Sequence, residues 1–448
     1  MEPKKPTKKI LMFPWLAFGH ISPFIQLAKH LSNTFEIHLC SSPVNLQSIQ
    51  SKLPRTPSNP IHLLHLNLPP SPELPPHMHS TNGLPLRLIP TLLNAFDKAA
   101  PDFTSILHKL NPDLLITDMF QPWAVHSAAA LNIPAVFFLV VGAGTFSHSV
   151  HSVLHHGVDF PFPELDLQNH WLFKRHQNDP SDSSVGVATS RFLQLVKDLE
   201  VYSDVVLVNS FMEIESKYID YLSVLFKKKV VPVGPLVALS DEKSDVLDWL
   251  DQKEPKSTVY VSFGSEYYLS NEDRAELAMG LEMSGANFIW VIRFGKGESV
   301  GIREALPEGF IERVGERGLV VDGWAPQMGI LKHTSIGGFV CHCGWNSVVE
   351  AAVNAVPIIA LPMQLDQPFH GKVAVAAGVA VEAARGVDGA VQREGVAKAI
   401  KEVLFEKKGE ELSGKAKEIC ESLKVKDGKN IDTCWSMHGS LEQVRSHT

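Results

Sequence analysis

The 448-residue sequence predicts an α/β protein with two halves, each built around a doubly wound parallel sheet. Short apolar runs alternate with helical patterns, which is typical of strand–helix–strand units and parallel sheets. The alternation stops at a polar, charged stretch and then starts again. We therefore expect a first domain at 1–238, a linker at 239–256 and a second domain at 257–429. Residues 430–448 are expected to form a tail that packs back on the first domain.

Five apolar runs are the expected strands of the first half. Each has the length and the Val, Ile, Leu and Phe content of a buried strand. They are 10–13, 36–40, 114–117, 135–140 and 205–209. Helical patterns lie at 23–32, 90–100 and 103–110, and Pro23 is expected to open the first of them. The proline-containing segments 54–90 and 157–190 are expected to be long loops, serving either as pocket walls or only as connections.

The second half repeats the pattern. Its expected strands are 258–265, 287–293, 319–324, 336–340 and 357–361. A short helix is expected in the linker at 246–250. Two such halves suggest a cleft between them, with ligands bound at the carboxyl ends of the strands.

Composition excludes several classes of protein. The net charge is −8 and no basic stripe appears, so nucleic acid is not an expected partner. The five cysteines are an odd number in a long chain, which argues against a disulfide framework. Cys341 and Cys343 lack the further soft ligands that a zinc site would need, so no metal is expected.

No segment has the pattern of a membrane anchor. The apolar run after the basic first residues is interrupted by Pro14, and the longest apolar segment, 133–146, is too short to span a bilayer. We expect a cytoplasmic monomer without membrane insertion.

The most informative stretch runs from Trp324 to Gln367. Within it, a glycine-rich strand is expected to turn into a helix at 347–354. Such a turn points backbone N–H groups and the positive helix end at one place, which suits a pyrophosphate. Side-chain donors in the turn are His342, Asn346 and Ser347.

Two further residues of this stretch suit a nucleoside. Trp324 offers a flat face on which a base can stack. Glu350 lies about one helical turn beyond Ser347, so its carboxylate can accept hydrogen bonds from ribose hydroxyls.

A second candidate site follows the first strand. His20 comes after Gly19 at the expected carboxyl edge of the sheet, where it can take a proton from a hydroxyl near neutral pH. Asp118 follows another core strand and is the expected partner that fixes the tautomer of His20.

These residues resemble those of family 1 plant UDP-glycosyltransferases, whose donor-binding box also runs from a Trp to a Gln. The resemblance implies the two-domain GT-B fold and a single inverting displacement, with His20 as the base and Asp118 as its partner. It implies that Trp324 stacks on uracil, that Gln327 and Glu350 hold ribose, and that Ser265, His342, Asn346 and Ser347 hold the diphosphate. Ala325 is a further residue of the implied UDP-sugar site. The residues that it implies for the donor sugar are Trp345, Asp366 and Gln367.

A narrower resemblance concerns enzymes that add a sugar to a sugar already attached to a flavonoid or terpenoid. It is carried by FPWLAFGHISPF, CSSPVNLQSI, LPPSPELPPHMHSTNGLP and VSFGSEYYLS. It implies transfer of glucose from UDP-glucose to a plant glycoside, without a cofactor. The expected apolar contacts of the acceptor are Trp15, Phe18 and Phe24. His370 departs from the family pattern, which commonly has Asn there.

Other readings remain open. The chain could glucosylate bare aglycone hydroxyls, interconvert UDP-sugars as an epimerase of the same fold, or bind UDP-sugars without catalysis. A nicotinamide dehydrogenase is disfavoured, because no G-x-G-x-x-G follows the first strand.

Overall fold

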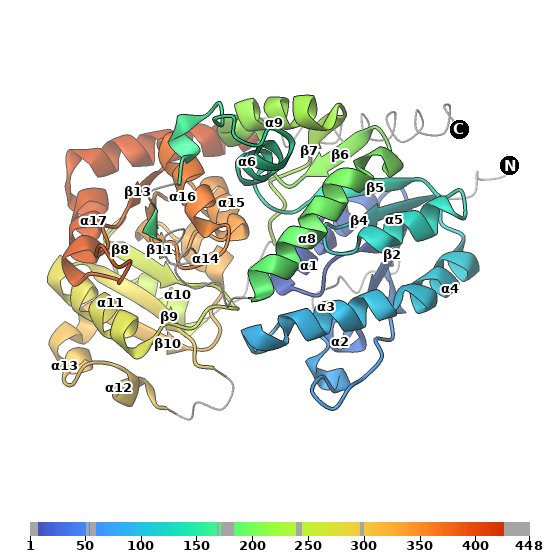
Figure 1. Ribbon diagram of the computed structural model, residues 1–448. Helices are drawn as coiled ribbons and strands as arrows, with labels where there is room; N and C mark the ends of the chain where they lie inside the picture. Colours follow the sequence, from blue (N-terminus) through green and yellow to red (C-terminus); the bar gives the residue numbers. More distant parts are fainter. Residues whose placement is uncertain are drawn as a thin grey trace, which may run out of the picture.

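Two parallel sheets form the cores of two halves that lie side by side (Figure 1). The computed structural model describes residues 8–50, 53, 60–167, 170–171, 183–238, 244–295 and 300–424. Helices cover both faces of each sheet, as the alternating sequence pattern requires. The expected α/β fold class with two doubly wound halves is therefore confirmed.

The first sheet has seven strands in the order β3-β2-β1-β4-β5-β6-β7. Their bounds are β1 (Lys9–Phe13), β2 (Glu36–Ser41), β3 (His62–His65), β4 (Leu114–Thr117), β5 (Ala135–Leu139), β6 (Val205–Val208) and β7 (Lys229–Pro232). The chain order reverses direction between β1 and β4, so the loops that leave these two strands meet at the switch point of the sheet.

The second sheet has six strands in the order β10-β9-β8-β11-β12-β13. Their bounds are β8 (Thr258–Ser262), β9 (Asn287–Ile292), β10 (Gly318–Asp322), β11 (Ile336–Cys341), β12 (Ile358–Ala360) and β13 (Ala380–Glu382). Here the switch point lies between β8 and β11.

Helices connect the strands in both halves. Those of the first half are α1 (Phe18–Leu31), α2 (Pro43–Gln50), α3 (Ile89–Lys98), α4 (Ala100–Leu110), α5 (Pro122–Ala129), α6 (Ala143–Leu154), α8 (Ser183–Asp198) and α9 (Met212–Phe226). After them come α10 (Asp245–Leu250), α11 (Asn271–Ser284), α12 (Ile302–Ala305), α13 (Phe310–Val314), α14 (Gln327–Lys332), α15 (Trp345–Val353), α16 (Gln367–Ala376) and α17 (Arg393–Phe405).

All ten expected strands are present, and three more were not expected. β3, β7 and β13 have three or four residues each, and β3 lies in a segment that was expected to be a loop. Strands this short carry too few alternating or continuous apolar positions to be separated from loops by sequence pattern.

The first helix differs from expectation. α1 begins at Phe18, not at Pro23, so Gly19 and His20 lie in its first turn. Proline has no N–H to donate, and Pro23 therefore leaves the carbonyl oxygen of Gly19 without its helical partner.

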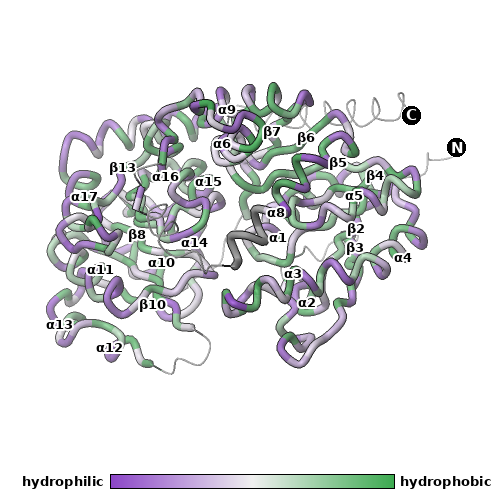
Figure 2. Tube along the Cα trace, viewed as in Figure 1, coloured by the Kyte–Doolittle hydropathy of each residue, from purple (hydrophilic) through white to green (hydrophobic). Residues whose placement is uncertain are grey.

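Apolar side chains join the two halves. Hydrophobic residues gather along the strands in Figure 2, while the outer helices carry the hydrophilic ones. One cluster of buried apolar side chains contains members of both halves, among them Phe146 of α6 and Trp345 of α15. The halves are thus packed against each other where the two sheets face.

The predicted domain boundaries remain a prediction. The linker contains α10, while residues 239–243 and the whole tail, 430–448, lie outside the described residues. Residues 407–424 are helical, and Ser422 Oγ donates to Glu213 Oε1 of α9 at 3.1 Å. The chain has thus returned to the first half before the tail begins. No helix among the described residues has both the length and the apolar character to span a membrane.

Candidate active site

His20 and Asp118 meet at the carboxyl edge of the first sheet. His20 lies in the first turn of α1, and Asp118 directly follows β4, the strand beside β1. His20 Nδ1 is 2.7 Å from Asp118 Oδ2. A carboxylate accepts, so Nδ1 carries the proton and Nε2 keeps its lone pair.

The Asp118 carboxylate is fixed from three sides. Besides the bond from His20, Oδ2 accepts from the backbone N–H of Trp15 at 3.2 Å, and Oδ1 accepts from that of Met119 at 2.6 Å. Burial lowers the pKa of His20, but the charge and hydrogen bond of Asp118, with Glu266 and Asp366 behind them, raise this pKa above its usual 6.5. His20 is therefore a stronger base than an ordinary histidine.

Aromatic side chains line one side of His20. The ring of Phe120 lies edge-on to the imidazole, with centroids 5.3 Å apart, and Trp15 stacks on Phe120 at 5.1 Å. Phe18 is half-buried in the same helix turn as His20. Phe120 was missed by the sequence analysis, although it follows Asp118 by two residues.

The expectation for Phe24 is wrong. Its ring is fully buried against Phe138 of β5, at 4.9 Å between centroids, and belongs to the core under α1. Phe24 lies one helical turn after His20 in α1, so the two side chains are on the same face of the helix. The error arose because Phe24 is buried under the helix, whereas His20 lies at the edge of the sheet.

Glu266 reaches the base from the second half and was also missed. It follows Ser265 in the loop after β8, and its Oε1 accepts from Thr81 Oγ1 at 2.7 Å and from Phe18 N at 3.4 Å. Glu266 could have been found from the sequence, because it directly follows Ser265 in the motif FGSE. Ser265 itself is half-buried beside it.

The turn after β11 carries a buried, neutral histidine. Burial lowers the pKa of His342 to about 4, and its Nδ1 is buried without a hydrogen-bond partner among the described residues. Gly264 and Gly344 flank the ring so closely that a Cβ at either would lie 2.8 or 2.7 Å from it. His342 can therefore give an anion one hydrogen bond but no positive charge.

The start of α15 faces the first half of the protein. The side-chain amide of Asn346 donates to Gly19 O at 3.0 Å, the carbonyl that Pro23 leaves free. Ser347 follows in the first turn and is 7% exposed. This contact places the N-terminus of α15, the expected pyrophosphate site, beside the residue that precedes His20.

Gln327 and Glu350 form the next part of the site. Gln327 Nε2 donates to Glu350 Oε2, and Tyr260 OH donates to Gln327 Oε1 at 3.2 Å. Burial raises the pKa of Glu350 to about 7, although the bond from Gln327 opposes this. The pair lies together as expected for a ribose site, with a carboxyl group whose charge depends on pH.

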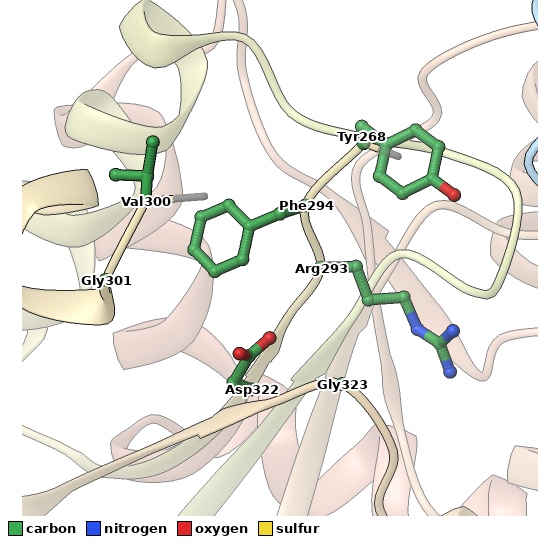
Figure 3. A pocket seen from close by; sticks show the side chains of 8 residues that line it. Tyr268, Arg293, Phe294, Val300, Gly301, Asp322 and Gly323 are labelled. Atoms are coloured by element: carbon green, nitrogen blue, oxygen red, sulfur yellow. The ribbon is translucent and has the colours of Figure 1, made fainter. Parts of the chain in front are cut away.

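Trp324 stands at the open end of this site. Its side chain is 63% exposed, whereas the next residue, Ala325, is buried. A cavity of about 480 Å³ lies at the carboxyl ends of β9 and β10 and borders Gly323, the residue before Trp324. Its lining is formed by Tyr268, Arg293, Phe294, Gly295, Val300, Gly301, Asp322 and Gly323. Figure 3 shows Tyr268 and Arg293 extending toward the same side of it.

The three residues expected to hold the sugar differ in their exposure and in the hydrogen bonds that their side chains already make. Asp366 is partly exposed at the start of α16. Gln367 Oε1 accepts from the backbone N–H groups of Met363 and Gln364, both at 2.9 Å, so this oxygen is already occupied. Trp345 is 4% exposed and its indole donates to Asn209 O of the first half. The indole N–H is thus not free for a sugar.

The one group of possible metal ligands in the described parts of the chain lies elsewhere. Glu36, His38 and His62 offer atoms within 4.8 Å of one another. Glu36 begins β2, so the group lies at the amino edge of the sheet, opposite His20. The candidate active site does not include it.

Comparison with known proteins adds an independent line of argument. The family model for UDP-glucoronosyl and UDP-glucosyl transferases matches residues 102–413. A mogroside IIIx synthase of Siraitia grosvenorii is 50% identical over 95% of this chain and 91% of its own. A beta-D-glucosyl crocetin beta-1,6-glucosyltransferase of Gardenia jasminoides is 42% identical over 94% of this chain and 96% of its own. Among solved structures, Glycyrrhiza uralensis UGT73P12 complexed with glycyrrhetinic acid 3-O-monoglucuronide matches with a TM-score of 0.83 and 25% identity, covering 98% of this chain and 97% of that one.

Proposed function

The chain belongs to the family of UDP-glucuronosyl and UDP-glucosyl transferases, and from this premise we propose that it transfers glucose from UDP-glucose to a sugar hydroxyl of a plant glycoside. The fold is GT-B, and the protein is a glycosyltransferase. The names of two relatives, a mogroside synthase and a glucosyl crocetin glucosyltransferase, support the choice of a glycoside acceptor.

One contact carries the mechanistic part of the proposal. Asn346 joins the N-terminus of α15 to the carbonyl of Gly19, the residue before His20. A diphosphate on that helix end would therefore place the bond to be broken close to the base. His20 Nε2 takes the proton of the acceptor hydroxyl, and Asp118 stabilises the imidazolium that forms.

The second half supplies the donor site in this proposal. Trp324 stacks on the uracil, and Gln327 and Glu350 bind the ribose hydroxyls. The diphosphate accepts hydrogen bonds from the first turn of α15 and from His342 and Ser265. Because His342 is neutral, the leaving diphosphate is stabilised mainly by the helix end and by neutral donors.

The acceptor binds on the side of the first half. Phe18, Phe120 and Trp15 form an apolar wall for the aglycone, and Glu266 lies at the polar end near His20. The attached sugar then places one hydroxyl at His20 Nε2, so that proximity supplies much of the rate. The same proposal includes that the protein works as a monomer, in the cytosol and without a metal.

The test is a transfer assay. The protein is incubated with UDP-glucose and a panel of aglycones and their monoglucosides, and the products are identified by mass and NMR. We expect one added hexose, a β linkage and a higher kcat/KM for the glucosides. An α linkage contradicts direct displacement, and a much higher kcat/KM for bare aglycones contradicts the glycoside acceptor. Sugar interconversion without transfer would indicate an epimerase.

A further inference from the structure

A buried polar joint connects α6 of the first half with the first turns of α15 and α16 in the second. Helix α6 packs against α16 where the two halves meet (Figure 1). The joint consists of hydrogen bonds that cross between the halves. Neither His20 nor Asp118 takes part in it. It does include Trp345, which the sequence analysis expected to hold the donor sugar.

The first bond of the joint comes from Trp345. Its indole N–H donates to the carbonyl of Asn209, at the carboxyl end of β6, at 2.5 Å. Trp345 is also the first residue of α15, whose N-terminus is the proposed diphosphate site. The bond therefore ties that helix end to the first sheet.

The second bond runs through His370, in the first turns of α16. His370 Nδ1 is 3.1 Å from Cys343 O, and its Nε2 lies 3.4 Å from the backbone N of Gly142. A carbonyl only accepts, so Nδ1 carries the proton and Nε2 accepts from Gly142. The neutral ring, 0% exposed, thereby bridges the turn before α15 and the residue that caps α6.

The first half is equally fixed at this point. The buried Glu215 accepts from the N–H groups of Ala143 and Gly144, both at 2.8 Å, and from Ser210 Oγ. With Gly142 bonded to His370, the N–H groups of Gly142, Ala143 and Gly144 at the start of α6 all have partners. Neither side of the joint can shift without leaving a buried polar group unpaired, which is costly.

Space at the joint is equally limited. A Cβ at Gly142 would lie 3.0 Å from Glu215 Oε1 and 3.1 Å from the ring of Trp345. A side chain there would require Trp345 or Glu215 to move by a few tenths of an ångström. Gly142 has an ordinary φ of −61°, so a side chain there would meet close contacts but no backbone strain.

We propose that His370 and Trp345 are positioning residues that set the distance between the donor site on α15 and α16 and the base on the first half. This inference rests on the proposed function. The joint lies behind the donor site, because Gln367 and Asp366 begin the same helix turn that carries His370. The side chains of the joint bond to groups of the protein, so they act on transfer through the placement of these helix ends.

Gly142→Ala tests the proposal against Gly414→Ala, a helical position with nothing within 4 Å of an added Cβ. For Gly142→Ala we expect kcat to fall about 10–100-fold, because small misplacements of reacting groups cost this much. The Kd for UDP, measured by calorimetry, should stay within about threefold, since its proposed contacts lie in one half. Gly414→Ala should match the wild type. An unchanged kcat in Gly142→Ala, or an equal loss of UDP affinity, overturns the proposal.

His370 offers a second pair of variants. His370→Asn keeps one donor and one acceptor and should retain most of kcat, whereas His370→Leu leaves Cys343 O and Gly142 N unpaired and should show the same split as Gly142→Ala. Similar kcat values for the two variants would contradict the role.

Scanning calorimetry tests the joint without activity. We expect Gly142→Ala to unfold at a lower temperature than Gly414→Ala, because a shift at Gly142 disturbs buried hydrogen bonds between the halves. If the wild type transfers no sugar, the proposed function is refuted, but the calorimetric comparison of the variants still tests the joint. Equal unfolding temperatures for Gly142→Ala and Gly414→Ala then refute the joint.

Discussion

The imidazole Nδ1 of His20 lies 2.7 Å from Asp118 Oδ2, although the two residues are 98 positions apart in the sequence. The pair lies at one edge of the sheet, because His20 is in the helix turn that follows β1 and Asp118 directly follows the neighbouring strand β4. His20→Ala should lower transfer by about 10²–10⁴-fold, the usual loss for a general base. UDP binding, measured by calorimetry, should persist, because no proposed donor contact involves His20. Full activity in this variant would exclude His20 as the base.

The pH profile should report the same pair. Asp118, together with Glu266 and Asp366, raises the pKa of His20 above 6.5 against the opposing effect of burial. The neutral form is the active base, so kcat/KM should rise with pH through this raised pKa. Asp118→Asn removes the strongest raising influence, and its acidic limb should move to lower pH while the plateau falls. Glu266→Gln should move the limb in the same direction by less. A limb that does not move in Asp118→Asn would contradict the coupling.

The ionised carboxylate of Glu350 should lower the stability of the folded protein while it contributes to binding of the donor. Its pKa is raised from 4.5 to about 7, so the folded protein holds this proton more tightly than the unfolded chain. Its ionisation therefore costs stability increasingly from pH 4.5 to about 7 and fully above that. Glu350→Gln removes this cost, and we expect a gain on the order of 1 kcal/mol at pH 8 that is absent at pH 4. The KM for UDP-glucose should rise. Thermal unfolding at both pH values gives the answer, and a gain of equal size at both would refute the assignment.

Much of the fold followed from the sequence because its strands are buried on both faces. Runs such as 114–117 and 258–262 are rich in apolar residues and buried along their whole length, and their alternation with helices indicates parallel sheets. The short edge strands β3 and β13 carry no such signal. The start of α1 was misplaced because Pro23 is favoured at the first turn of a helix but is also tolerated slightly deeper.

The candidate site was only partly predictable for a different reason. His20, Asp118 and the donor stretch stand at strand ends that the chain order alone identifies. Glu266 approaches His20 from the other half, and the indole N–H of Trp345 donates to Asn209 O of the first half. Contacts between halves depend on how two sheets pack, which no local pattern encodes.

Trp324 should contribute to binding without contributing to folding. Its side chain is 63% exposed, so its removal leaves no cavity in the core. Trp324→Ala should raise the KM for UDP-glucose about 5–150-fold, since stacking on a base contributes about 1–3 kcal/mol. Trp324→Phe should recover much of the loss, and the melting temperature of both variants should stay near that of the wild type. An unchanged KM in Trp324→Ala would place the base elsewhere.

Gln367 should act on the donor sugar through its amide N–H₂ group only. The amide was expected both to donate and to accept, but its Oε1 already accepts from Met363 N and Gln364 N. These bonds fix the orientation of the side chain and leave Nε2 as the group available to a sugar hydroxyl. Gln367→Glu keeps an acceptor for both backbone N–H groups, removes the donor and adds a negative charge beside Asp366. We expect kcat/KM for UDP-glucose to fall about tenfold or more, as for a lost hydrogen bond worth about 1.5 kcal/mol, with little change in melting temperature.

Gln367→Ala loses the backbone bonds as well and should be both less active and less stable. Equal melting temperatures for the two variants would show that the backbone bonds do not hold the loop, and wild-type kcat/KM in Gln367→Glu would show that Nε2 does not contact the sugar.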